Sequence, residues 1–319
     1  MSRDPRRIDV HFHILPEFYR SAVLSAGRGP TSGVYPSWTP ELAFELMDGN
    51  GIEVAITSIS FPGVHFGDDA AASALARRCN EFAADLNAKW PRRFGAFATL
   101  PVPDVDGSLA EITYALDSLR MDGVFLLASY EGRFLGDPLF DPILQELDRR
   151  GATVFVHPGM HPSSMSVGLP WPGFMMEFLF DTTRAAVNLL FTGALERYPN
   201  IHFILSHAGG LMPYFAWRLS VAPMISPLLP RYDRATILGA LRRFWYDTAL
   251  SPGRQTMGCL SEVADPPRIV FGSDWPFAGG DVVKAATETL DEVGFLETER
   301  QVAIARGNAL ALFPRFAGN

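Results

Sequence analysis

Eight short apolar runs alternate with helical patterns along the whole chain, and this alternation limits the folds available to it. The predicted strands are Ile8–His13, Glu53–Ile59, Phe94–Leu100, Gly123–Leu127, Thr153–His157, His202–His207, Phe244–Thr248 and Arg268–Asp274. The predicted helices are Pro40–Asn50, Asp69–Lys89, Ser108–Arg120, Pro138–Arg150, Met175–Tyr198, Leu211–Leu219, Arg234–Arg242, Asp281–Val293 and Glu297–Leu312. Strands buried on both faces read as continuous apolar runs, so eight of them separated by helices predict an α/β fold, the (β/α)8 TIM barrel.

An open doubly wound sheet is the alternative, but no G-x-G-x-x-G sequence follows any predicted strand. The 319 residues are enough for one barrel or for two ordinary domains. We find no Gly/Ser-rich linker and no internal repeat, and therefore expect one domain over residues 1–319. The segments at about 15–39 and 158–174 are longer than barrel loops require, and we expect them to cover the face at the carboxyl ends of the strands.

The composition excludes several classes of protein. Hydrophobic residues make up 48% of the chain and charged residues 19%, which is typical of a globular protein with a sizeable core. A net charge of −8 argues against nucleic-acid binding. The N-terminus lacks the apolar segment of a signal peptide and no stretch reads as a membrane span, so we expect a cytoplasmic protein. The two cysteines, Cys79 and Cys259, have no metal-binding spacing and are expected in the core.

Histidines gather at the ends of the predicted strands. Phe12 separates His11 from His13, so both imidazoles leave the first strand on the same face. An isolated pair of this kind is more often two half-buried, hydrogen-bonded histidines. However, the fifth, sixth and eighth predicted strands end in His157, His207 and Asp274. Because the carboxyl ends of barrel strands meet at one cavity, the five side chains together favour a metal site.

Three imidazoles and one carboxylate suit Zn²⁺, with one position open for water or substrate, and Mn²⁺ or Fe²⁺ is the alternative. The remaining histidine would be free to move protons near neutral pH. Spacing alone does not decide which histidine that is. The only lysines, Lys89 and Lys284, lie in helical contexts and cannot bridge two metals as a carboxylated lysine would. We therefore expect one divalent metal ion.

The pieces "DVHFH", "VHP", "SHAGG" and "FGSDWPF" together resemble the amidohydrolase superfamily, in particular its branch of non-oxidative decarboxylases that includes aminocarboxymuconate-semialdehyde decarboxylase. The resemblance covers nearly the whole chain. The longer stretches "YALDSLRMDGVFLLASYEGRFLGDPLFDP" and "DTTRAAVNLL" are most similar to 6-methylsalicylate decarboxylases. The order of four separate motifs makes the resemblance specific.

The resemblance implies a role for each site residue. The metal ligands would be His11, His13, His157 and Asp274. His207 would act as the catalytic acid or base. An arginine eleven residues after that histidine binds the substrate carboxylate in the branch and can reach across a dimer interface; here this position is Arg218. A homodimer is therefore expected.

We expect a metal-dependent decarboxylase of an aromatic acid with an ortho hydroxyl group. The proton for the ring would come from Asp274, or from a water steered by His207, and no organic cofactor is needed. Phe12 and Trp275 are assigned to contact the aromatic ring. The alternative is a mononuclear hydrolase of a lactone or an amide, which would use the same metal and acid/base groups. A barrel that holds a metal without activity would leave the extra histidine unexplained.

Other polar and aromatic residues carry weaker assignments. Asp247, at the end of the seventh strand, is a candidate to orient a histidine. His65 and Arg184 are candidates for substrate contact, against a surface role for each. His161 is not expected to bind the metal, and His202 is expected to be structural. The residues that could stack on a ring or form a lid are Trp38, Trp171, Phe174 and Trp275.

Overall fold

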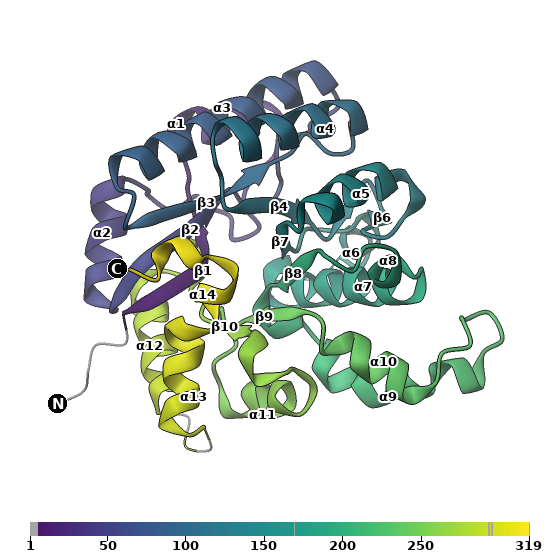
Figure 1. The fold of residues 1–319 in the computed structure, drawn as a ribbon. Helices are drawn as coiled ribbons and strands as arrows, with labels where there is room; N and C mark the ends of the chain where they lie inside the picture. Colours follow the sequence, from purple (N-terminus) through teal and green to yellow (C-terminus); the bar gives the residue numbers. More distant parts are fainter. Residues whose placement is uncertain (1–5, 169, 293, 295, 319) are drawn as a thin grey trace.

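A computed structural model describes residues 6–168, 170–292, 294 and 296–318. Eight parallel strands form a single sheet in sequence order, and a layer of helices surrounds them (Figure 1). The strands are β1 (Arg7–His13), β2 (Ile52–Ser58), β3 (Phe94–Thr99), β4 (Gly123–Leu127), β7 (Thr153–His157), β8 (His202–Leu205), β9 (Trp245–Asp247) and β10 (Ile269–Val270). The predicted TIM barrel is confirmed.

The barrel closes between its first and last strands. The backbone N–H of Val10 donates to the carbonyl of Phe271 at 3.0 Å, and that of His13 donates to the carbonyl of Trp275 at 2.7 Å. Phe12 and Trp275 also form a parallel bridge. These contacts bring the end of β1 against the segment that follows β10, so residues more than 250 positions apart (for example, Asp9 and Ser273, |i−j| = 264) become neighbours.

Helices follow most strands and pack on the outside of the barrel. They are α1 (Glu17–Ser25), α2 (Pro40–Gly49), α3 (Asp69–Lys89), α4 (Val105–Thr113), α5 (Asp141–Arg150), α6 (Pro162–Met165), α7 (Glu177–Phe191), α8 (Ala194–Arg197), α9 (Met212–Ile225), α10 (Arg234–Leu241), α11 (Arg254–Val263), α12 (Gly280–Asp291), α13 (Thr298–Val302) and α14 (Ala309–Leu312). Their starts follow local chemistry: the Asp68 side chain accepts from the N–H of Ala71 at the start of α3. Among the described residues, no helix is both long and apolar enough to cross a membrane.

Several helices differ from the sequence prediction. The segment 15–39, expected as a loop, contains α1, and the segment 158–174 contains the short α6. Helix α11 was not predicted at all. The long helix predicted over Met175–Tyr198 is two helices, because Gly193 lies between them with φ of +75°. A left-handed residue cannot continue an α-helix, and glycine adopts that conformation at little cost.

Two predicted boundaries at the C-terminal side also moved. Helix α9 continues past the predicted end at Leu219 to Ile225 and, with α10, projects away from the barrel (Figure 1). Helix α12 ends at Asp291, and the predicted end, Val293, lies outside the described residues. Cys79 is buried as expected, but Cys259 is exposed on α11, so the prediction for Cys259 is wrong. Because no helix was predicted at this position, the exposed location of Cys259 on it could not be predicted either.

Candidate metal centre

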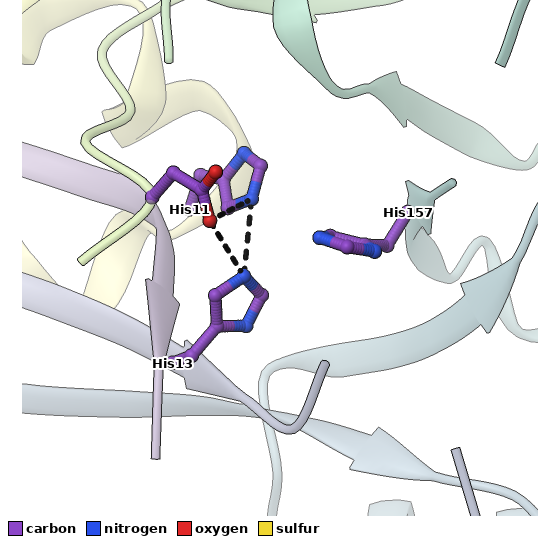
Figure 2. A group of neighbouring side chains, drawn as sticks. His11, His13 and His157 are labelled. Atoms are coloured by element: carbon purple, nitrogen blue, oxygen red, sulfur yellow. Dashed lines mark hydrogen bonds and ion pairs between the residues drawn. The ribbon is translucent and has the colours of Figure 1, made fainter. Parts of the chain in front are cut away.

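The centre is built where the strands end. His11 and His13 lie on β1 with both side chains fully buried, and His157 is the last residue of β7. The rings of His11 and His13 lie side by side, and His157 faces them across a gap (Figure 2). Gly272, next to this strand, leaves the space that His11 needs, since a Cβ at Gly272 would lie 2.8 Å from the Cβ of His11.

Four donor groups converge. The Nε2 atoms of His11 and His13 are 3.2 Å apart. Asp274 places Oδ1 at 3.4 Å from His11 Nε2 and at 3.2 Å from His13 Nε2. One donor atom from each of His11, His13, His157 and Asp274 lies within 4.8 Å of all the others. The structure therefore brings together the four residues that the family resemblance implied as ligands.

Hydrogen bonds hold the imidazoles by their Nδ1 atoms. His13 Nδ1 lies 3.1 Å from the carbonyl oxygen of Ile59, and His157 Nδ1 lies 2.7 Å from that of Pro158. A carbonyl oxygen only accepts, so both Nδ1 atoms carry the proton. His11 Nδ1 lies 2.7 Å from Asp247 Oδ2, which likewise favours a proton on Nδ1. In the neutral form of each ring, the Nε2 lone pair then faces the centre, as metal-binding histidines require.

Asp247 connects His11 of the metal centre with His207. Besides its contact with His11, its Oδ1 accepts from the backbone N–H of His207 at 2.9 Å and from that of Ala249 at 3.0 Å. Asp247 is fully buried on β9. Its expected role in orienting a histidine agrees with this geometry, and the same carboxylate also fixes the backbone of His207.

His207 lies beside the four donors without being one of them. Its Nδ1 donates to the carbonyl oxygen of Ala249 at 3.1 Å, and its Nε2 is 4.0 Å from Asp274 Oδ2. His207 and Ala208 have φ of +53° and +57°, and Asp274 has φ of +65°. Such conformations are rare outside glycine and persist where the surrounding structure enforces them. A residue with such a φ cannot continue a strand, so His207 and Asp274 lie outside β8 and β10, which end at Leu205 and Val270.

Burial and charge set the protonation states. Burial, reinforced by the positive charge that His13 and His11 carry when protonated, holds the pKa of His157 well below its usual value, and burial also lowers the pKa of His207. Burial opposes the charge on His11, but the carboxylates of Asp247 and Asp274 raise its pKa to about 10. Burial also opposes the charge on Asp274, yet His11 and the other imidazoles hold its pKa well below the usual range. A cation at the centre would take the place of the proton on His11.

The donor set fits one divalent cation. Three imidazole nitrogens and a carboxylate oxygen, oriented by hydrogen bonds on their far sides, are the ligands expected of a mononuclear catalytic site that keeps a position open. Neither lysine lies there: Lys284 is on α12 beside Glu288, and Lys89 is at the end of α3 over the ring of Trp90. This agrees with a single metal.

A cavity of about 760 Å³ lies near the centre, although none of the four donors lines it. We call it the mouth cavity; its apolar wall includes Phe61, Leu100, Val102, Phe125, Leu127 and Met160. The ring of Phe125 lies 6.0 Å from that of His157, measured between centroids, so the cavity begins one side chain away from a donor. His65 and Trp171 also line this cavity, from the loop after β2 and from the segment 158–174.

The two aromatic residues assigned to the substrate lie elsewhere. Phe12 is fully buried between the two histidines of β1 and, by strand alternation, points to the other face. Its ring packs against Trp275, with centroids 4.8 Å apart. Neither residue lines the mouth cavity, and the packing of the two rings against each other accounts for the burial of both. Their contact with substrate stays a prediction.

The weaker candidates are dispersed. His161 stacks on Phe134 and contacts the carbonyl of Gly132, and His202 is exposed at the opposite end of the barrel, so neither is among the four donors. Trp38 lines a separate cavity between α1 and α3, and Arg184 lies over the ring of Phe180. Phe174 is exposed on the segment after α6.

Arg218 lies on the exposed face of α9 and does not line the mouth cavity of its own chain. Among the described residues, no side chain forms a hydrogen bond or an ion pair with it. It is flanked by exposed apolar side chains: Tyr214 is 75% and Trp217 is 65% exposed. Within one chain, then, the structure does not bring Arg218 to the centre.

Sequence reasoning missed two buried carboxylates. Asp9 accepts from the N–H of His11 at 3.0 Å and from that of Ser273 at 3.1 Å, which ties β1 to the segment that carries Asp274; burial raises its pKa to about 7. Asp181 on α7 accepts from the N–H of Gly159 at 2.8 Å and from Ser129, and so fixes the turn after β7. Asp9 could have been found, because it precedes His11 by two residues and therefore shares its face of the strand.

Comparison with known proteins agrees with this site. A family model described as amidohydrolase matches residues 8–315. The chain is 40% identical to a 6-methylsalicylic acid decarboxylase from Penicillium expansum, over 98% of this chain and 97% of the relative. The chain therefore belongs to the amidohydrolase family. This confirms the resemblance found in the sequence, including the decarboxylase branch.

Two solved structures extend the likeness to three dimensions. A 2,6-dihydroxybenzoate decarboxylase, complexed with 2,6-dihydroxybenzoate, has a TM-score of 0.83 at 28% identity and covers 97% of this chain and 99% of its own. A dihydroxybenzoic acid decarboxylase from a Polaromonas species, with bound manganese and the inhibitor 2-nitroresorcinol, also has a TM-score of 0.83, at 26% identity, and covers 97% of this chain and 96% of its own. Decarboxylases of aromatic acids thus share both sequence and barrel with this chain.

Proposed function

We propose that the protein is a metal-dependent, non-oxidative decarboxylase of an aromatic acid with a hydroxyl group next to the carboxylate, that is, a carboxy-lyase. The observation that carries this proposal is the convergence of four metal-binding groups beside a separately held histidine, His207. Relatives named for 6-methylsalicylic acid and for 2,6-dihydroxybenzoate support the substrate class, since both acids carry an ortho hydroxyl group.

His11, His13, His157 and Asp274 would hold the metal. When bound, a divalent cation would anchor substrate oxygen atoms and stabilise the negative charge on them. Zn²⁺ is our first assignment, because it takes imidazole and carboxylate ligands with one position left open. Mn²⁺ is the alternative, which the bound manganese of the Polaromonas relative supports.

Residues of the chain itself would transfer the proton. Loss of carbon dioxide needs a proton on the ring carbon that carries the carboxylate; the carbon–carbon bond then breaks and its electron pair returns to the ring. His207 Nδ1 is occupied by the carbonyl of Ala249, so its Nε2, 4.0 Å from Asp274 Oδ2, is the atom that takes up and releases a proton. Asp274, or a water that His207 steers, would deliver that proton to the ring carbon.

A homodimer would supply the positively charged side chain, Arg218, that binds the substrate carboxylate. Arg218 has no partner among the described residues of its own chain, and exposed apolar side chains surround it on the projecting α9. Beyond Tyr214 and Trp217, these are Met224, Ile225 and Leu228, which are 78%, 79% and 92% exposed. Exposed apolar side chains gathered on one helix and just after it favour a protein–protein contact at this face. We assign this face to a second copy of the chain, whose site would receive Arg218.

The test is incubation of the purified, metal-analysed protein with a panel of hydroxybenzoates, with carbon dioxide release as the readout. Acids with an ortho hydroxyl group should release carbon dioxide, whereas the meta and para isomers should not, because only the ortho oxygen can share the centre with the carboxylate. Lactones and amides in parallel test the hydrolase alternative. Hydrolysis without any carbon dioxide release would overturn the proposal.

A further inference from the structure

We propose that the aromatic acid carries a hydrocarbon substituent longer than a methyl group, and that the mouth cavity receives it. The inference rests on the proposed decarboxylase function. It begins with the centre itself: the four donors are between 0% and 7% exposed, so the carboxylate and the ortho hydroxyl must enter a closed space. The opposite side of the ring then faces the mouth cavity, which starts at Phe125 beside His157.

The buried wall of the mouth cavity is apolar. Leu100, Val102, Phe125 and Leu127 line it and are each at most 5% exposed. Thr99 adds one hydroxyl group to this deep part. A wall of this kind stabilises hydrocarbon and disfavours a further hydroxyl or carboxylate, because a buried polar group without a partner is costly.

The polar side chains around the cavity are already engaged or lie at its rim. The Ser129 hydroxyl donates to Asp181 at 2.9 Å, and the Tyr130 hydroxyl accepts from the backbone N–H of Leu127 at 2.8 Å. The charged side chains of Arg28 and Glu131 also line the cavity but are exposed. A substituent that passes through the deep part therefore meets hydrocarbon first and charge only at the rim.

The size of the cavity sets the length of the substituent. Its volume of about 760 Å³ falls within the range of roughly 300–1,000 Å³ typical of sites that enclose a drug-sized ligand. A methyl group would leave most of this space to water. Met160 and Met165 line the outer part, and the flexible methionine side chain adapts to chains of different length.

The test is a series of salicylates with a 4-alkyl side chain of one, two, three or five carbons, which lies opposite the carboxylate, given to the metal-loaded protein. Each methylene that leaves water for the apolar wall should raise kcat/KM about 4-fold until the cavity is filled. Dissociation constants of the matching 3-alkylphenol products, measured by calorimetry, should fall in the same steps. If the methyl compound is decarboxylated and kcat/KM stays flat or falls with length, the inference is wrong and the proposed function stands. If this series releases no carbon dioxide but 6-methylsalicylate does, the inference is also wrong; if 6-methylsalicylate releases none either, the proposed function itself fails.

A pair of variants ties the effect to the cavity. Met160→Gln keeps the length of the side chain but places an amide in the wall, so the gain per methylene should shrink. Met175→Gln makes the same change on a methionine that is 54% exposed and does not line the mouth cavity, and it should keep the wild-type gain. Equal gains in both variants would place the alkyl chain outside the mouth cavity.

Discussion

Asp247 Oδ2 and His11 Nδ1 lie 2.7 Å apart, although 236 residues separate the two in sequence. The carboxylate can only accept from this nitrogen, which keeps the His11 proton on Nδ1 and the Nε2 lone pair toward the centre. The same carboxylate accepts from the N–H of His207. One buried side chain thus sets the tautomer of His11, a proposed metal ligand, and the position of His207, the proposed acid/base residue.

Replacing Asp247 by Asn should weaken metal binding about 10- to 100-fold, the usual scale for loss of a partner behind a ligand. The Asn amide can still accept from His207 and Ala249 through its oxygen. Its NH₂ group would then face His11 Nδ1 and drive the proton to Nε2, where the metal should bind. The dissociation constant measured by competition with a chelator tests this.

The control is Asp69→Asn. Asp69 also pairs with a histidine, His65, at 2.8 Å, but its side chain is 71% exposed on the surface. Its loss should leave metal affinity unchanged. If the Asp247 variant binds metal as tightly as this control, the proposed dependence of His11 on Asp247 is wrong.

His157→Ala should abolish stoichiometric metal binding. The remaining donors, His11, His13 and Asp274, leave one side of the centre open, because His157 comes from β7 on the other side of the gap. Elemental analysis should find about one metal per wild-type chain and far less in the variant. His161→Ala removes a histidine four residues away that stacks on Phe134, and it should keep the metal. Two metals per wild-type chain would contradict the mononuclear assignment.

His207→Ala should keep the metal and lose about 10²- to 10⁴-fold in turnover, the scale for a missing general acid or base. His207 Nε2 is 4.0 Å from the nearest Asp274 oxygen, and its ring is not needed to complete the four donors. Metal content and turnover are measured on the same preparation. Loss of the metal together with activity would instead make His207 a ligand.

Cys259 should react with a thiol reagent in the folded protein, and Cys79 should not. Cys79 is 1% exposed on α3, and burial raises the pKa of its thiol far above the usual value, so almost no thiolate forms. Cys259 is exposed. A colorimetric thiol assay should count one group in the native protein and two after unfolding. Two rapidly reacting thiols in the native state would contradict the packing of α3.

The pattern of apolar runs was sufficient to predict the barrel. The residues at the strand ends were sufficient to predict which metal-binding groups lie close together. This worked because a buried parallel strand leaves a continuous apolar run, and because every strand of a barrel ends at the same face. His11, His13, His157 and Asp274 could therefore be placed together without any knowledge of their distances. Which histidine stands apart was not predictable from spacing; the family resemblance assigned it.

Other features depended on tertiary contacts that leave no periodic signal. The positive φ angles of His207 and Asp274 exclude both residues from the strands predicted to contain them, and such angles persist only where the surrounding structure enforces them. Asp181 acts on the turn after His157 from a helix 22 residues further on, a distance that no local pattern reports. The split at Gly193 follows from the left-handed conformation of that glycine, which an apolar helical pattern on both sides of it does not report.

Arg218→Ala should abolish most of the activity if the arginine serves the site of a second chain. Within its own chain Arg218 is exposed and does not line the mouth cavity, so an effect on turnover would need a partner. Ile225→Glu, which places a charge on the same apolar face of α9, should then dissociate the dimer and lower activity with it. Sedimentation at several protein concentrations measures the oligomeric state. An active monomer would show that the centre is complete in one chain.

Mixing two inactive variants tests the shared site directly. In a mixed dimer of an Arg218→Ala chain and a His207→Ala chain, one site would combine the intact His207 of the first chain with the intact Arg218 of the second. Random exchange in a two-fold dimer should therefore restore about a quarter of the wild-type activity. An arginine that only pairs with a surface carboxylate is worth about 0–1 kcal/mol and could not produce this recovery. No recovery despite demonstrated subunit exchange would place Arg218 outside the partner's site.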